Sequence, residues 1–163
     1  MKRTSIAIAL SCLLFSASNC VVADSTLVNK YSDDNLIQIV KNEGYSAVEK
    51  INDGMIRIKV DGAGLVLFNK EDGDLQLYYS IGGAKVTTDD MNEWNRTKRL
   101  SRAYLDSDND PTLESDLLAN AGMTEKHVIE FVNVFKISVS SFRAFVIKQN
   151  RSSPVTPAMG RGG

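Results

Sequence analysis

The chain has 163 residues, of which 43% are hydrophobic and 24% charged, and its formal net charge is −1 at neutral pH. This composition is typical of a globular protein, and the length suits one domain behind a leading segment. A protein that coats nucleic acid needs a strongly basic face, so the near-neutral charge argues against a nucleic-acid partner.

Residues 1–23 carry the pattern of a secretory signal peptide. A basic start precedes an apolar run over residues 6–15, and small residues lead up to Ala23. The apolar run is too short to cross a bilayer as a helix. We therefore expect cleavage after Ala23 and export to the periplasm or the medium.

Cleavage would remove both cysteines, Cys12 and Cys20, and leave a mature chain of 140 residues. Its net charge would be −3, because Lys2 and Arg3 depart with the signal and no acid does. A chain without cysteine excludes a disulfide scaffold, a thiol nucleophile and a cysteine metal site. The alternative is a lipoprotein with Cys20 as the lipidated residue, for which Asn19 is a poor preceding residue. No segment of the mature chain approaches the length of a membrane span.

The mature sequence begins with a predicted leader over residues 24–31 and a helix capped by Ser32 or Asp33, which ends at Gly44. Four strands follow, over residues 45–51, 55–60, 65–69 and 75–81, with turns rich in Asn, Asp and Gly between them. In the second strand, apolar residues alternate with Arg57 and Lys59. One apolar and one polar face are typical of an antiparallel sheet that is covered on one side.

Thr87 or Thr88 begins a second helix, on which Met91 and Trp94 share an apolar face. We interpret Trp94 as a core anchor, with a ligand platform as the alternative. Four cations follow without an intervening acid: Arg96, Lys98, Arg99 and Arg102. Their structural interpretation is the preference of a helix C-terminus for positive charge. Their functional interpretation, together with Trp94, is a surface that binds an anion or an acidic partner.

Two more strands are predicted, over about residues 100–106 and 112–118. Pairing Leu105 with Leu113 gathers the apolar side chains on one face, with a loop at residues 107–111. Arg102 then lies opposite Asp116 as a favourable charge pair, and Tyr104 lies opposite Glu114.

The turn between these strands contains Asp106, Asp108 and Asp110, as in the first half of a calcium loop. The glycine and the bidentate glutamate that such a loop requires are replaced by Pro111 and Leu117. We therefore predict a solvated hairpin turn and no metal site.

A long helix is predicted from a cap at Thr124 to about Lys148, with a disordered tail over residues 149–163. Its apolar residues step by four and three along one face, and Phe131 and Phe145 widen that face. We name this face the apolar seam: Val128, Val132, Phe135, Val139, Phe142 and Val146. Such a seam can cover a sheet or serve a homodimer.

The element order α-β-β-β-β-α-β-β-α predicts an α+β domain over residues 32–148, with helices packed on one face of an antiparallel sheet. His127 is the only histidine, and a lone imidazole makes neither a zinc site nor a catalytic triad. The chain carries no motif of a serine hydrolase, a zinc protease or a phosphate loop. We therefore expect no enzyme: no catalytic residue, no cofactor and no metal.

The segment from Asn92 to Arg99, with Arg102 to Asp106 and Asp110-Pro111, resembles the YbjN-domain family of bacterial proteins. The steps Gly44-Tyr45, Asp72-Gly73-Asp74-Leu75 and Gly122-Met123-Thr124 resemble it further. Leu100 departs from the family, which often has an aromatic residue there. The resemblance spans about residues 33–147 and implies a fold like that of type III secretion chaperones, which dimerise and bind partner chains.

Two functions are compatible with these observations. The resemblance implies a regulator of sensory transduction, in a family of which some members affect exopolysaccharide, motility or stress responses. The first function is therefore a non-catalytic exported binding module, chaperone-like or adaptor-like, that holds a protein partner or forms a homodimer. The second is a periplasmic sensor of an anionic small molecule or polymer, with the four cations as its contact.

Overall fold

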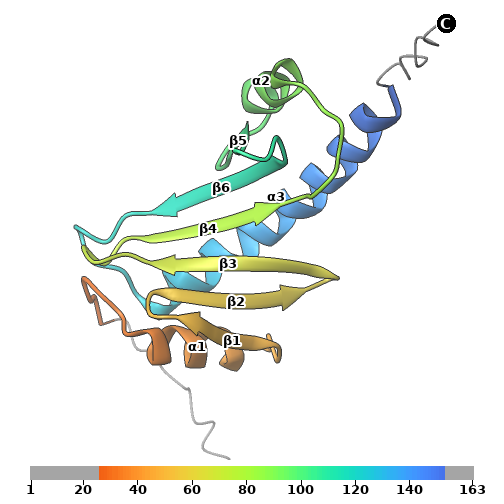
Figure 1. Ribbon diagram of the computed structural model, residues 1–163. Helices are drawn as coiled ribbons and strands as arrows, with labels where there is room; N and C mark the ends of the chain where they lie inside the picture. The colour runs from red at the N-terminus through yellow and green to blue at the C-terminus, as the bar shows by residue number, and fades with distance from the viewer. Residues whose placement is uncertain (1–25, 153–163) are drawn as a thin grey trace, which may run out of the picture.

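The computed structural model describes residues 26–152 (Figure 1). The predicted signal peptide and the tail beyond Ser152 therefore lie outside the described residues. The elements are α1 (Asp33–Asn42), β1 (Val48–Asn52), β2 (Met55–Val60), β3 (Ala63–Asn69), β4 (Leu75–Ser80), α2 (Thr88–Thr97), β5 (Arg102–Leu105), β6 (Pro111–Leu117) and α3 (Glu125–Ser152). This order confirms the α+β prediction. The last helix runs to Ser152, four residues past the predicted end at Lys148.

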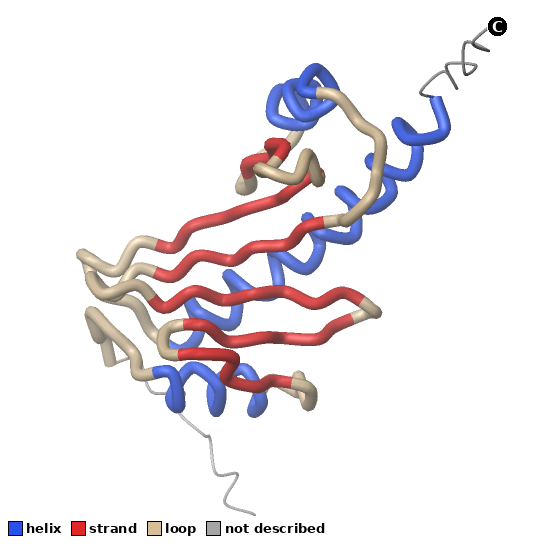
Figure 2. The backbone as a smooth tube through the Cα atoms, in the orientation of Figure 1, coloured by secondary structure: helices blue, strands red, loops and turns tan. Residues whose placement is uncertain are grey.

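The strands form one antiparallel sheet in the order β1-β2-β3-β4-β6-β5 (Figure 2). α2 interrupts the meander, so the hairpin of β5 and β6 joins the sheet through β6 rather than β5. β1 and β5 are the edge strands. The element order predicted these strands, but their spatial order comes from the structure.

Local sequence accounts for where the helices begin and end. The Ser32 hydroxyl accepts a hydrogen bond from the Asn35 backbone N–H at the start of α1. Thr87 and Asp90 form a capping box at the start of α2. Gly44 follows α1 with a φ of 103°, a left-handed conformation that glycine adopts without strain. These predicted boundaries are confirmed.

The core lies between the sheet and α3, which runs behind the strands in the view of Figure 1. All six residues of the apolar seam are buried, the most exposed at 3%. Alternate residues of the central strands face the seam, including Ile56, Leu67 and Leu77, each with no exposed surface. Burying one such side chain contributes about 1.5–3 kcal/mol. The seam is therefore occupied within the chain, and any partner must use another surface.

The predicted register of β5 on β6 is wrong by two residues. Arg102 pairs with Glu114, and Leu105 pairs with Pro111 rather than Leu113. The Asp106 carboxylate accepts hydrogen bonds from the backbone N–H groups of Asp108 and Asp110, at 3.0 and 2.9 Å, and so tightens the turn. A shift by two keeps every side chain on its face, so alternation alone cannot detect it.

Residues 26–31, which were predicted as a leader, pack against the domain. Val28 and Met123 exchange two backbone hydrogen bonds of 3.0 and 2.9 Å. Gly73 lies so close to this segment that an added Cβ would stand 2.0 Å from the Asn29 carbonyl oxygen. The leader therefore ties the start of α1 to the β3–β4 turn and to the entry of α3.

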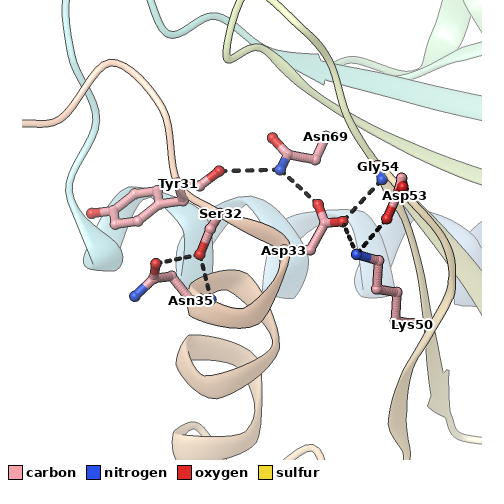
Figure 3. Close-up of polar contacts among 8 residues, drawn as sticks. All are labelled: Tyr31, Ser32, Asp33, Asn35, Lys50, Asp53, Gly54 and Asn69. Atoms are coloured by element: carbon pink, nitrogen blue, oxygen red, sulfur yellow. Dashed lines mark hydrogen bonds and ion pairs between the residues drawn. The ribbon is translucent and has the colours of Figure 1, made fainter.

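The Asp33 carboxylate joins the start of α1 to β1, to the β1–β2 turn and to β3 (Figure 3). It accepts hydrogen bonds from the Asn69 amide at 2.8 Å and the Gly54 backbone N–H at 3.0 Å, and it pairs with the Lys50 ammonium at 3.0 Å. The hydrogen bond from the Asn69 amide is the largest cause that lowers the pKa of Asp33, and burial opposes it. With the further contributions of the Gly54 N–H and the Lys50 ammonium, the pKa falls from 3.8 to about 2. Asp53 extends the network by pairing with Lys50 at 2.7 Å.

We expect Asp33→Asn to be less stable than the wild type at neutral pH, with the difference shrinking in acid. The folded-state pKa lies below the ordinary value, so ionised Asp33 stabilises the fold above about pH 4, and this contribution is lost as the pH falls to about 2. The shift corresponds to about 2 kcal/mol at neutral pH. Urea unfolding across this pH range measures it. Asp53→Asn is the matched control, because its side chain is fully exposed; an equal effect of the two variants would contradict the assignment.

Candidate functional site

Trp94 belongs to the core and not to the surface. Its residue is 1% exposed, and its ring packs edge-on against Phe142 and Phe145 of α3, with centroids 5.0 and 5.6 Å apart. Its indole N–H donates to the Ser101 hydroxyl at 3.4 Å. Trp94 is therefore a core anchor that fixes α2 to α3. It is not part of the candidate binding surface, which corrects that prediction.

The four cations do not share one contact: three of them have different partners within the domain, and Arg99 has no ion pair in the described residues. Arg96 pairs with Glu93 within the last turn of α2, and Arg102 pairs with Glu114 on β6. The Lys98 ammonium lies 5.7 Å from the centroid of the Trp94 ring. Arg99 is exposed, and no ion pair within residues 26–152 involves it.

Glu114 is a buried carboxylate at the open end of the β5–β6 hairpin, opposite Arg102, the first residue of β5. Its residue is 7% exposed, and it accepts hydrogen bonds from the Arg102 guanidinium and from the Tyr104 hydroxyl, the latter at 2.5 Å. Burial, reinforced by this carboxylate, raises the pKa of Tyr104 well above its usual range. The hydrogen bond that Arg102 donates to Glu114 likewise raises the pKa of Arg102. A buried charge with two donors is stable where it lies, and this cluster holds β5 on β6.

The acidic turn is built from internal hydrogen bonds. The carboxylate of Asp110 accepts a hydrogen bond from the Gly83 backbone N–H at 2.8 Å. The backbone N–H groups of Asp110 and Asp108 donate to the Asp106 carboxylate and lower its pKa. In the described part of the chain, no three His, Cys, Asp or Glu side chains are placed to hold a metal ion. His127 accepts a hydrogen bond from the Thr124 backbone N–H at 3.1 Å and so caps α3.

A surface groove of about 500 Å³ lies between the second half of β6 and the first turns of α3. We name it the β6–α3 groove. Its lining is predominantly apolar and includes the acidic residues Glu114, Asp116 and Glu130. The apolar part of the lining includes Leu100, Leu117, Phe131 and Val134. Phe131 was noticed in the sequence only for widening the seam, and nothing in the spacing linked it to β6.

Leu100 lines the groove in a strained and exposed conformation. It is 67% exposed and has a φ of 64°, a left-handed conformation that costs a bulky residue about 1–2 kcal/mol. The Ser115 hydroxyl donates to its carbonyl oxygen at 2.8 Å and holds the turn against β6. Strain and exposure together on an apolar side chain are typical of a binding surface.

The backbone edge of β5 is closed by a side chain. The Asn95 amide nitrogen donates to the Ala103 carbonyl at 2.9 Å, and the Ala103 N–H donates to the Asn95 amide oxygen at 2.8 Å. The amide thus takes the place of a neighbouring strand, which protects the edge from pairing with another chain. β5 is therefore not the surface that a partner strand would use.

The described residues define a class of protein: a sheet covered by helices on one face, with an open apolar groove beside it. No described helix has the length and apolar character of a membrane span. Residues 32–148 match the family model "YbjN: Putative bacterial sensory transduction regulator". The chain therefore belongs to the YbjN family, as its resemblance indicated.

The fold is also similar to that of a solved protein. The structure "Crystal structure of YbjN, a putative transcription regulator from E. coli" matches with a TM-score of 0.61 and 18% sequence identity, over 78% of this chain and 96% of that one. At this identity the likeness supports the fold alone. The search of curated proteins gives no match. The likeness to type III secretion chaperones stays a prediction.

We expect Arg102 to be energetically coupled to Glu114 and much less to Asp116. In the observed register the guanidinium contacts Glu114, whereas the predicted register placed it opposite Asp116. A double-mutant cycle of Arg102→Ala with Glu114→Ala should give a coupling free energy of about 0.5–3 kcal/mol. The same cycle with Asp116→Ala is the control, and urea unfolding supplies the stabilities. A larger coupling to Asp116 would contradict the observed register.

Proposed function

We propose that this protein is a non-catalytic regulatory binding module that holds an apolar segment of a partner chain in the β6–α3 groove. The observation that carries the proposal is the groove itself, which has a volume of about 500 Å³ and a mostly apolar lining. Leu100, one of its lining residues, is 67% exposed. An exposed apolar surface with a polar margin is typical of a protein-binding site.

Membership of a family described as regulators supports a binding role over catalysis. The charged side chains of the hairpin support it as well. Glu114, Tyr104 and Arg102 are occupied with one another, and the carboxylates of the acidic turn accept backbone hydrogen bonds. The apolar seam is buried, so a partner that binds beside α3 must use another surface, and the groove offers a mostly apolar one. In the exported form that the sequence predicts, the partner would be a protein of the cell envelope.

We expect a photo-crosslinking amino acid at position 131 to capture a protein partner in living cells. Phe131 lines the groove and is only partly buried, so benzoylphenylalanine can replace it with little change in packing. Position 137 is the matched control, because Ile137 lies on the same helix, is 65% exposed and does not line the groove. Mass spectrometry of the adducts identifies the partner chain, which is another protein or a second copy. Equal crosslinking from both positions, or none from position 131, would overturn the proposal.

A second candidate function is the sensing of an anionic ligand through the cation cluster. The observation that favours it is Arg99, which is exposed and which no carboxylate within residues 26–152 pairs with. Lys98, its neighbour, is also exposed. Arg96 and Arg102 already have carboxylate partners, so the contact would rest mainly on Lys98 and Arg99.

For this second function we expect polyphosphate to raise the melting temperature of the wild type and Arg99→Glu to abolish most of that rise. The reversal replaces an attraction by a repulsion, and added salt should weaken the effect by screening. Lys41→Glu is the matched control, since Lys41 is an exposed cation at the end of α1. An equal loss in both variants would mean that only net charge is sensed, and the second function would fail.

A further inference from the structure

We infer that the partner segment binds as an extended strand that continues the line of β5 along β6, with basic residues alternating with apolar ones. The inference rests on the proposed function and deepens it. It assigns the binding mode and the chemistry of the segment: its apolar side chains enter the β6–α3 groove, and its basic side chains lie beside Asp116.

The first step is the length of β5. It pairs with residues 111–114 of β6 only, because Arg102, its first residue, lies opposite Glu114. β6 continues to Leu117, and its other side is paired with β4 throughout. Within the described chain, no strand pairs with the outer side of β6 beyond Glu114, and the Leu100 turn reaches that side through the hydrogen bond from the Ser115 hydroxyl to the Leu100 carbonyl. An exposed strand end of this kind can accept an added strand.

The second step is the direction of the backbone groups. The N–H and C=O of Ala103 point to Asn95 and away from β6. Along an antiparallel strand the backbone N–H and C=O groups of successive residues point to opposite neighbours. The backbone groups of Leu113, the partner of Ala103, therefore bond to β4, and those of Glu114 bond to β5. The backbone groups of Asp116 then point away from β4. The carbonyl of Pro111 accepts from Ile81, next to β4, in agreement with this phase. Asp116 therefore presents one donor and one acceptor to an incoming strand.

The third step is the side-chain alternation of the added strand. A residue directly opposite Asp116 points to the uncovered face of the sheet, as Asp116 does, and its neighbours point to the α3 side. Phe131 and Val134 of α3 line the groove on that side, beside Leu117. An apolar neighbour would therefore enter the groove.

The fourth step is charge. Asp116 and Glu130 line the groove, and no ion pair within residues 26–152 involves either of them. The one guanidinium in the lining, Arg102, is already paired with Glu114. The groove thus combines a mostly apolar lining with acidic residues, which favours lysine or arginine in the segment and disfavours acidic residues.

The experiment uses a labelled synthetic octapeptide in which lysine and valine alternate, with binding followed by fluorescence anisotropy. In the proposed antiparallel arrangement one lysine lies opposite Asp116, so the lysine amides face β6 and the valine amides face away. We expect methylation of the lysine amides to weaken binding by about tenfold or more, and methylation of the valine amides to change it little. A peptide with glutamate in place of lysine should not bind.

Protein variants separate this inference from the proposed function. Phe131→Asp and Val134→Asp should each abolish peptide binding, whereas Ile137→Asp, outside the groove, should retain it; thermal unfolding verifies that each variant is folded. If the groove variants lose binding but the two methylated series are equal, the groove function stands and strand addition is overturned. If the peptide fails to bind while position 131 crosslinks a partner, the assigned segment chemistry is overturned. A crosslink only to a second copy overturns the inference in favour of a homodimer.

Discussion

The apolar seam of α3 is the constraint on which the rest of the structure depends. A six-stranded sheet with one apolar face must be covered, and the seam covers it with side chains that are at most 3% exposed. Trp94 then fixes α2 to the far part of the same helix through Phe142 and Phe145. Because α2 is fixed, Asn95 reaches the edge of β5. One helix thus positions the sheet, the second helix and the hairpin that borders the groove.

The two halves of the outer edge of β6 differ in how they are covered. Over the first half, β5 pairs with β6, and the Asn95 amide in turn covers the outer edge of β5. The second half has no paired strand; the Leu100 turn reaches it through the Ser115 hydroxyl, and it lies beside the partly exposed Phe131. Proteins usually protect such edges because they pair with other chains. An edge left open beside an apolar groove, next to a strained and exposed Leu100, is consistent with binding rather than with stability.

Helix caps, strand positions and the buried face were predictable because each depends on residues close together in the sequence. Ser32, Thr87 and Gly44 act within one turn of their helices, and alternation over six residues identifies the buried side of β2. The register of β5 on β6 was not predictable, because a shift by two preserves every face and the Asp106 carboxylate decides the turn. The cations were predicted as a cluster, but their partners Glu93 and Glu114 depend on geometry that spacing does not contain.

By itself, the sequence determined the family, the α+β element order and the residues of the apolar seam, because periodicity and capping are local properties. The tertiary structure formed the β6–α3 groove, which residue spacing does not reveal. It buried Trp94, joined β6 to β4, and brought Phe131 and Val134 of α3 beside Leu117 of β6. The physical reason is that a groove is made by side chains distant in sequence, whose approach depends on how the whole core packs.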